Sequence, residues 1–351
     1  MFPIFQPARL LRNPHLQTIW PSLWMESLPP YKAIQHRIDL ADGDQIVLHD
    51  DQPADWQQGD PVVLMTHGLT GSFESSYLVR LAHKLNERGF RTFRKDLRNC
   101  GAGFGLARYP YHAGRSHDLL ASIDHIHELS PHSPISLVGY SLSGNIVLRT
   151  LAEEPDQLPP HLVTAVAVNP PVDLYRSVQA LNTLLGRFYD RYFTRRLVKH
   201  IRLLAESNPI HDQIKFKSVP RTIYQLDDAY TAPMSGFDSA EHYYAETSSR
   251  KILNRIKLPS LVLTADDDPL IPVEMFSGLE SHPAVTLHVA PHGGHLGYRG
   301  KQGADPDRHW MDWRILEWLE KHGRFWPEPQ QTIAAPHFGR HKAKCHLQSD
   351  C

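Results

Sequence analysis

One serine of this chain stands in a setting typical of a nucleophile: Ser141, in the segment Gly139-Tyr140-Ser141-Leu142-Ser143-Gly144. The apolar run at residues 135–138 predicts a buried strand before it, and residues 145–152 predict a helix after it. A strand, a tight turn of small residues and a helix together hold a serine hydroxyl clear of the backbone. Such a hydroxyl attacks a carbonyl group when a histidine takes its proton and a carboxylate orients that histidine.

The candidate carboxylates follow the strand predicted at residues 260–264, where Asp266, Asp267 and Asp268 stand in a row. Active sites of open α/β sheets lie at such carboxyl ends of strands. We favour Asp268 as the orienting acid because Pro269 restrains it to an extended conformation. We expect Asp266 and Asp267 to be surface or capping groups of the loop.

The candidate histidines follow the strand predicted at residues 285–289, in the run His292-Gly293-Gly294-His295. The two glycines allow the backbone to turn so that one imidazole points back toward the serine. We therefore favour His295, which follows this hinge, as the general base. A metal site on the two histidines would need a third ligand and a regular scaffold that the sequence does not show. We expect no metal and no organic cofactor.

Two backbone N–H groups are needed to stabilise the oxyanion that forms when an acyl carbonyl is attacked. One candidate is Leu142, directly after the nucleophile, and the other is Leu69, in the loop that follows the strand predicted at residues 61–66. Gly68 permits close approach of the backbone at this loop. His67 is an alternative base, but its place ahead of the glycine favours a structural histidine that holds the loop.

The remaining elements predict an α/β fold with a mostly parallel central sheet and helices on both faces. Residues 33–50 read as a hairpin, and apolar runs and helical periodicity then alternate along the chain. Between residues 172 and 250 no buried strand is evident, which predicts a helical cap inserted over the site. We assign residues 1–327 to one domain and residues 328–351 to a mobile tail. Four aromatic residues either line an acyl pocket or form the core of the cap: Phe188, Tyr189, Tyr192 and Phe193.

Composition excludes several classes of function. The 351 residues carry a net charge of −1 with no basic block, which gives no electrostatic basis for binding nucleic acid. Three cysteines cannot form a disulfide framework, and with no signal peptide or membrane span evident we expect a cytoplasmic protein. The aromatic N-terminal segment, residues 1–24, is expected to pack on the core as a strap; a peripheral membrane contact is the alternative. The sequence does not determine the oligomeric state.

These motifs resemble the YheT-type branch of the α/β-hydrolase superfamily. The resemblance spans roughly residues 10 to 320 and is specific because several motifs agree in order; they are Asn13-Pro14-His15-Leu16-Gln17-Thr18, His67-Gly68-Leu69-Thr70-Gly71-Ser72, Asp96-Leu97-Arg98-Asn99-Cys100-Gly101, Tyr111-His112-Ala113-Gly114, the segment around Ser141, Asp267-Asp268-Pro269 and His292-Gly293-Gly294-His295. It implies hydrolysis of carboxylic esters, with acyl lipids or short-chain esters as substrates. The family usually has glycine where this chain has Ser143, so modest crowding is expected there.

The predicted mechanism joins Ser141 as nucleophile, His295 as base and Asp268 as orienting acid, with the N–H groups of Leu69 and Leu142 as the oxyanion hole. An acyl-enzyme forms and water then hydrolyses it. Acyl transfer to an alcohol or thiol by the same residues is one alternative. A scaffold that binds a ligand under its cap without turnover is another.

Overall fold

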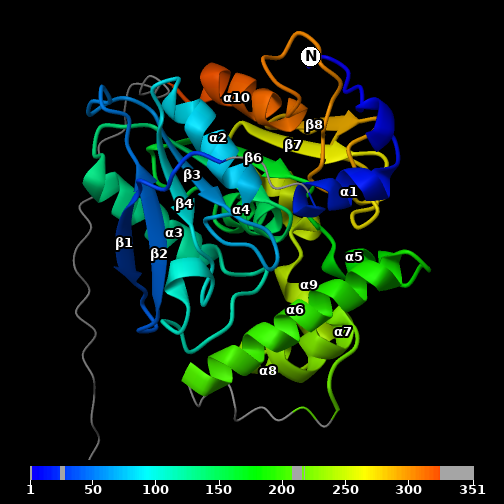
Figure 1. Ribbon diagram of the computed structural model, residues 1–351. Helices are drawn as coiled ribbons and strands as arrows, with labels where there is room; N and C mark the ends of the chain where they lie inside the picture. The colour runs from blue at the N-terminus through cyan, green and yellow to red at the C-terminus, as the bar shows by residue number, and fades with distance from the viewer. Residues whose placement is uncertain (1, 24–27, 208–215, 217, 325–351) are drawn as a thin grey trace, which may run out of the picture.

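A single twisted sheet organises the molecule. The computed structural model describes residues 2–23, 28–207, 216 and 218–324, and within these ranges eight strands pair in the order β1-β2-β4-β3-β5-β6-β7-β8 (Figure 1). β2 pairs antiparallel with β1 and β4, and all other neighbours are parallel. The predicted mostly parallel α/β sheet is thus confirmed. The strands are Ile34–Asp39 (β1), Gln45–Asp51 (β2), Val62–Thr66 (β3), Arg91–Lys95 (β4), Ile135–Tyr140 (β5), Leu162–Val168 (β6), Ser260–Ala265 (β7) and Val285–Ala290 (β8).

The parallel strands at the centre of the sheet are apolar on both faces because helices cover both. In β3, Val62 and Leu64 belong to the cluster under α3 and α4, whereas Val63 and Met65 belong to the cluster under α2 and α10. Alternate side chains of a strand point to opposite faces, so a strand buried on both sides must be apolar throughout. These helices span Ser76–Asn86 (α2), Ser116–Leu129 (α3), Leu142–Glu153 (α4) and Trp310–His322 (α10).

The segment between β6 and β7 stands apart from these layers. Its described part forms helices and no strand, and these helices gather below the sheet (Figure 1). They are Leu174–Ala180 (α5), Gly186–Ser207 (α6), Ile223–Leu226 (α7), Ala232–Met234 (α8) and Ala240–Thr247 (α9). The predicted helical cap at residues 172–250 falls on this segment, whereas the predicted tail at residues 328–351 lies outside the described residues.

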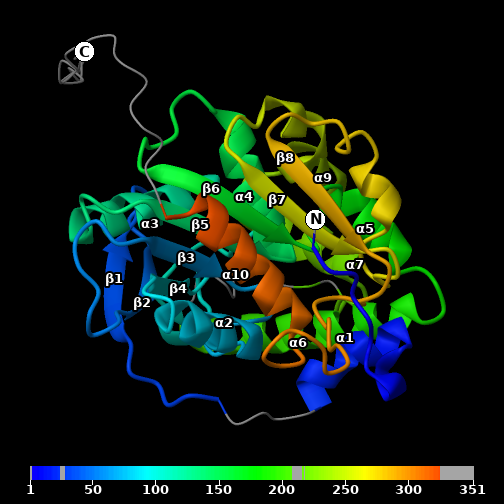
Figure 2. The same ribbon diagram turned by 90° about the horizontal axis from the view of Figure 1, so that it is seen from above.

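The N-terminal segment packs against the last helix of the sheet layer. Phe5 and Leu11 are buried, and the Phe5 ring lies 5.4 Å from that of Trp310. Helix α1 (Pro14–Leu23) follows and lies beside the cap helix α6 in both views (Figures 1 and 2). The segment is therefore a strap on the core, as expected, although Ile4 and Leu10 face solvent.

Candidate active site

Ser141 sits at a sharp turn between β5 and α4. Its backbone has φ 51° and ψ −120°, a conformation that non-glycine residues rarely adopt and that surrounding structure must hold in place. Close packing explains the small residues around it: a Cβ on Gly139 would lie 2.4 Å from the carbonyl oxygen of Ser143. The predicted sequence of strand, turn and helix is present, with the helix starting directly after the serine.

A continuous chain of hydrogen bonds connects the three residues that the sequence singled out. The Ser141 Oγ lies 2.9 Å from Nε2 of His295, and Nδ1 of the same ring lies 2.9 Å from Oδ2 of Asp268. The Asp268 side chain is fully buried and that of His295 is only 9% exposed. Three loops, after β5, β7 and β8, bring these groups together at the carboxyl edge of the sheet.

Further donors fix the Asp268 carboxylate. Its Oδ1 accepts hydrogen bonds from the backbone N–H groups of Leu270 and Ile271, and its Oδ2 accepts one from Asn169 Nδ2 at 2.5 Å. The Tyr298 hydroxyl in turn donates to Asn169 Oδ1 at 2.9 Å. Sequence reasoning missed Asn169, although a polar residue directly after the buried strand β6 is a usable signal. These donors set the orientation of the carboxylate toward His295.

The histidine loop is held by helix α1, which lies far away in sequence. The His295 N–H donates to Thr18 Oγ1 at 2.9 Å, and the Thr18 hydroxyl donates to the Pro14 carbonyl. The buried Gln17 side chain donates to the Arg299 carbonyl and accepts from the Arg299 N–H. The N-terminal motif that supports the resemblance therefore positions the loop that carries the candidate base.

His67 has the structural surroundings that the sequence favoured over a role as base. Its Nε2 accepts from the Leu97 N–H at 3.1 Å, so Nδ1 carries the proton and donates to the Gly68 carbonyl at 2.8 Å. Burial lowers the pKa of His67 to about 4, which keeps the ring neutral. Because the C=O and N–H of a trans peptide point in opposite directions, this bond turns the Leu69 N–H away from His67.

The loop that carries Leu69 lies directly against the nucleophile. A Cβ on Gly68 would lie 3.0 Å from the Ser141 Cβ, so glycine permits the contact. Leu142 opens α4 and has no acceptor for its N–H within the helix. Among the described residues, no acceptor is found for the Leu69 N–H either. Both candidate oxyanion donors are thus free to bind a substrate oxygen.

Ser143 makes a contact that the sequence did not suggest. Its hydroxyl donates to the His67 carbonyl at 2.5 Å, while the Tyr77 hydroxyl accepts from the Gly68 N–H on the other side of the same peptide. The expectation of mere crowding at Ser143 therefore misses a bond between the turn at Ser141 and the Leu69 loop. No sequence signal indicated it, because the two partners are 76 positions apart.

The other acidic residues and histidines of these loops have supporting contacts. Asp267 accepts from the Gly294 N–H and lies 3.2 Å from Nδ1 of His292, whose side chain is 48% exposed. Asp267 therefore braces the histidine loop, in keeping with the expected capping role. Among the residues that the structure describes, no three His, Cys, Asp or Glu side chains form a group that could hold a metal ion.

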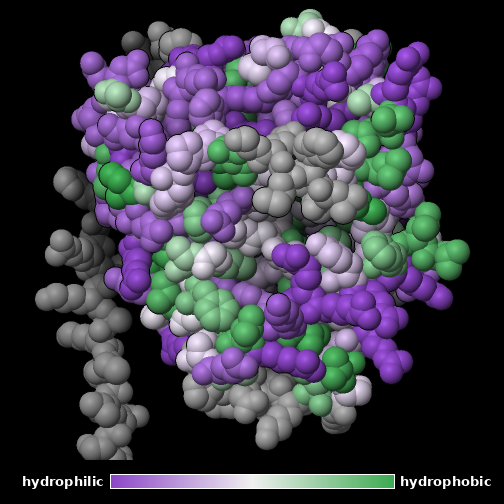
Figure 3. Space-filling view, viewed as in Figure 1, coloured by the Kyte–Doolittle hydropathy of each residue, from purple (hydrophilic) through white to green (hydrophobic). Residues whose placement is uncertain are grey.

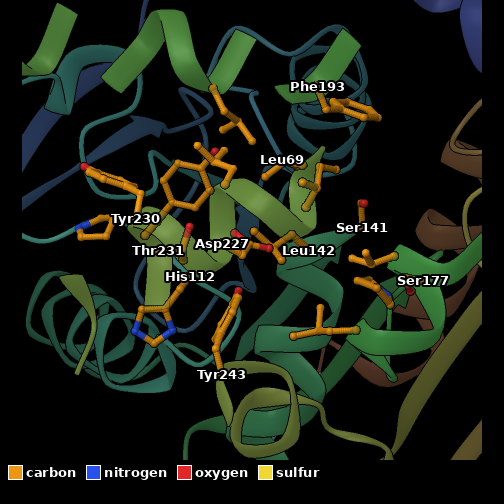
Figure 4. A pocket seen from close by; sticks show the side chains of 18 of the residues that line it. Leu69, His112, Ser141, Leu142, Ser177, Phe193, Asp227, Tyr230, Thr231 and Tyr243 are labelled. Carbon is orange, nitrogen blue, oxygen red and sulfur yellow. The ribbon is translucent and has the colours of Figure 1, made fainter. Parts of the chain in front are cut away.

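A cavity of about 150 Å³ opens beside Ser141 and runs under the cap. Its wall is almost entirely carbon, and Ser141, Leu69, Leu142 and Phe193 surround one part of it (Figure 4). Among the polar residues of its lining is Asp227, whose Oδ2 accepts from the Tyr244 hydroxyl at 2.7 Å. Burial raises the pKa of Asp227 to about 6. An apolar chain bonded to a carbonyl carbon at Ser141 would thus find an apolar cavity.

The four aromatic residues of α6 divide between the inside and the outside of the cap. Phe193 lines the cavity, and Tyr189 is buried with its hydroxyl 3.0 Å from His15 Nδ1. Phe188 is 63% exposed and Tyr192 is 41% exposed. For these two, the expectation of either a pocket wall or a cap core was wrong, because they lie on the outer face of the helix.

Comparison with known proteins identifies the family. A sequence model described as the alpha/beta hydrolase fold matches residues 61–299. The chain belongs to this family. It is 31% identical over 320 residues to the candidate esterase YheT of Escherichia coli, across 90% of this chain and 92% of that protein. The YheT-type resemblance is thereby confirmed.

Other relatives are also named as ester hydrolases, and solved structures share the fold. The monoacylglycerol lipase of Saccharomyces cerevisiae is 29% identical across 71% of this chain and 57% of its own length, and mouse phospholipase ABHD3 is 27% identical across 80% and 73%. The Pyrococcus furiosus esterase Pf2001 superposes with a TM-score of 0.55 at 16% identity, over 92% of this chain and all of that one. The protein is a carboxylic ester hydrolase.

Proposed function

We propose that the protein hydrolyses carboxylic esters with apolar acyl chains through a Ser141–His295–Asp268 triad and an acyl-enzyme. The observation that supports this most strongly is the unbroken chain of 2.9 Å contacts from the Ser141 hydroxyl to the Asp268 carboxylate at the end of an apolar cavity. The three residues act together, because the serine hydroxyl needs a base to take its proton and the histidine base needs a carboxylate to fix its tautomer.

In the first half of the reaction, Ser141 Oγ attacks the ester carbonyl and His295 Nε2 takes the hydroxyl proton. Asp268 accepts from Nδ1–H and stabilises the imidazolium. The N–H groups of Leu69 and Leu142 bind the oxyanion, and His295 then gives its proton to the departing alcohol. In the second half, His295 takes a proton from water, the hydroxide attacks the acyl-enzyme, and the acid leaves as Ser141 regains its proton.

The substrate class follows from the wall of the cavity. Carbon surrounds it from Leu142 to the inner face of α6, which favours the acyl chain of a lipid ester over a sugar or a peptide. Two relatives are named for lipid substrates, a monoacylglycerol lipase and a phospholipase. Acyl transfer would use the same residues, so product analysis with an added alcohol separates it from hydrolysis.

Fluorophosphonate labelling tests the proposal directly. We expect an adduct on Ser141 in the full chain and loss of both adduct and esterase activity, by about 10⁴-fold or more, in Ser141→Ala. Ser143→Ala is the matched control, since it removes the other serine of the turn and should keep the adduct. Esterase activity that persists in a folded Ser141→Ala protein would sink the assignment, and a ligand-binding scaffold without turnover would explain a folded protein that is never labelled.

A further inference from the structure

The outer face of α6 combines positive charge with exposed apolar side chains. The exposed side chains of α6 define this outer face, and six of them are cations: Arg187, Arg191, Arg195, Arg196, Lys199 and Arg202. Glu206 is the one exposed carboxylate of the helix, since Asp190 is buried against the Ile223 N–H. The whole chain has a net charge of −1, so this accumulation is local.

Apolar side chains stand among these cations and continue beyond the helix. Leu184 is 86% exposed, and Leu185, Phe188, Tyr192 and Leu203 also face solvent. On the neighbouring N-terminal segment Leu10 and Leu16 are exposed beside Arg9 and Arg12. The contact of His15 with Tyr189 joins the two segments. In Figure 3, apolar residues gather at the right edge, on the N-terminal segment and the loop before α6, with hydrophilic residues along α6. We call these exposed residues of both segments the α1–α6 surface.

The cations of α6 are available for an external partner. Arg187, Arg191, Arg195, Lys199 and Arg202 form no ion pair with any carboxylate in the part of the chain that the structure describes. Arg196 contacts only the Tyr192 ring and hydroxyl of its own helix. Isolated charges are common on surfaces, but six of one sign on a single helical face with exposed leucine and phenylalanine are the pattern of a helix that lies in a membrane interface.

The inner face of the same helix connects this surface to the candidate active site. Phe193, Leu197, Ile201 and Leu204 project into the cavity that contains Ser141 and His295. The α1–α6 surface and the apolar cavity are thus two sides of one helix. A lipid held at the α1–α6 surface would therefore lie against the same helix that lines the cavity.

We infer that the α1–α6 surface docks the protein on an anionic lipid bilayer. An acidic protein or a nucleic acid would match the arginines but would leave Leu184, Leu185 and Phe188 in water. A bilayer interface matches both, because anionic headgroups attract the cations and the acyl boundary receives the apolar side chains. No helix in the described ranges is long and apolar enough to span a membrane.

Vesicle co-sedimentation of the full chain tests the inference. The Ser141→Ala protein serves as parent so that vesicle lipids stay intact, and the binding result does not depend on whether the proposed function holds. We expect binding to vesicles of phosphatidylcholine mixed with phosphatidylglycerol, and binding at least about tenfold weaker to phosphatidylcholine alone. A parent that binds both vesicles equally, or neither, overturns the inference.

A pair of matched charge variants locates the surface. A basic residue at an anionic membrane contributes about 1 kcal/mol, or about fivefold in binding, so Arg191→Glu with Arg195→Glu should weaken binding by about 30-fold or more. Arg37→Glu with Lys251→Glu makes the same change of net charge on exposed residues elsewhere and should alter binding less than about twofold. Equal losses in both variants would overturn the assignment to α6.

An apolar pair separates a bilayer from a soluble polyanion. Phe188→Ser should weaken vesicle binding by about fivefold or more, whereas Ile34→Ser, on the equally exposed Ile34 of β1, should not. Unchanged vesicle binding by Phe188→Ser would identify the surface as a site for an acidic protein or a nucleic acid and overturn the lipid inference. The same substitutions in the Ser141 protein should leave hydrolysis of soluble p-nitrophenyl butyrate unchanged, which shows that they fold.

Discussion

The loops at the carboxyl edge of the sheet and the helix α6 that covers the cavity differ in how firmly their side chains are held. At the sheet edge, Ser141, Asp268 and His295 are joined by hydrogen bonds, and the Asp268 and His295 side chains are at most 9% exposed. On α6 the outward side chains have few partners and face water. Catalysis requires reacting atoms placed within a fraction of an ångström. Docking on a membrane requires only positive charge and exposed apolar area.

This difference predicts which substitutions should change catalysis and which should change binding to a membrane. Changes at the sheet edge should lower kcat and leave vesicle binding alone. Changes on the outer face of α6 should do the reverse. The inner face of α6 and its neighbours, including Asp227, lie between these extremes because they line the cavity without touching the hydrogen-bond chain.

After the loss expected for Ser141→Ala, the largest expected effect is at Asp268. Asp268→Asn should lower kcat for p-nitrophenyl butyrate by about 10³- to 10⁴-fold, because an amide no longer holds the His295 proton on Nδ1. Asp267→Asn, one position earlier, should cost less than about tenfold, since Asp267 braces the loop without contacting His295. Vesicle binding should be unchanged in both. Equal losses of kcat would contradict the division of roles between the two aspartates.

An intermediate effect is expected at Asp227, and it concerns stability. Burial raises the folded-state pKa of Asp227 to about 6, above its unfolded value of about 4, so the folded state binds the proton more tightly. The contribution to stability is therefore complete below about pH 4 and is lost as the pH rises through about 6. Asp227→Asn should raise the free energy of unfolding by roughly 2 kcal/mol at about pH 8 and change it little at about pH 4.

Urea unfolding at several pH values measures this effect. The control is Asp228→Asn, which removes the neighbouring, exposed carboxylate that accepts from the Ala240 N–H. The control should show no gain in stability at high pH. If the free energy of unfolding of Asp227→Asn also shows no gain at high pH, burial does not destabilise the ionised Asp227. The cavity would then be more polar than its lining indicates.

The smallest expected effect is at Ser143, where the turn and the oxyanion loop are joined. Ser143→Ala should lower kcat by about tenfold with little change in KM, because the His67 carbonyl loses the donor that positions the Leu69 loop. Ser143→Gly, the residue usual in the family, tests the same bond. The control, Ser177→Ala, alters a cavity residue on α5 and should change KM more than kcat. A fall in kcat for Ser177→Ala without a fall in kcat for Ser143→Ala would contradict this prediction.

Much of the fold was predictable because its signals are local. The apolar runs of β3, β5 and β6 are buried strands because each strand lies between two helix layers, and burial on both faces leaves no place for polar residues. The turn at Ser141 was recognisable for the same kind of reason, since a strand, small residues and a helix adjoin there in sequence. The roles assigned to Ser141, Asp268 and His295 stay predictions until the labelling experiment is done.

The supporting contacts were beyond sequence reasoning because they join distant segments. Asn169 reaches Asp268 across 99 positions, and the Thr18 hydroxyl meets the His295 N–H across 277. A threonine or an asparagine gives no indication of its partner until the chain has folded. The bond from Ser143 to His67 is of the same kind, and a single chain shows only that the residue is small.

By itself, then, the sequence determined which residues form strands, which turn carries the serine, and which loops supply an acid and a histidine, because periodicity and turn chemistry act between neighbours in the chain. Only the tertiary structure decided that Phe188 and Tyr192 face solvent while Phe193 faces the cavity. Helical spacing distinguishes two faces of α6 but does not say which one packs. That choice depends on where the sheet, α1 and the rest of the cap leave space.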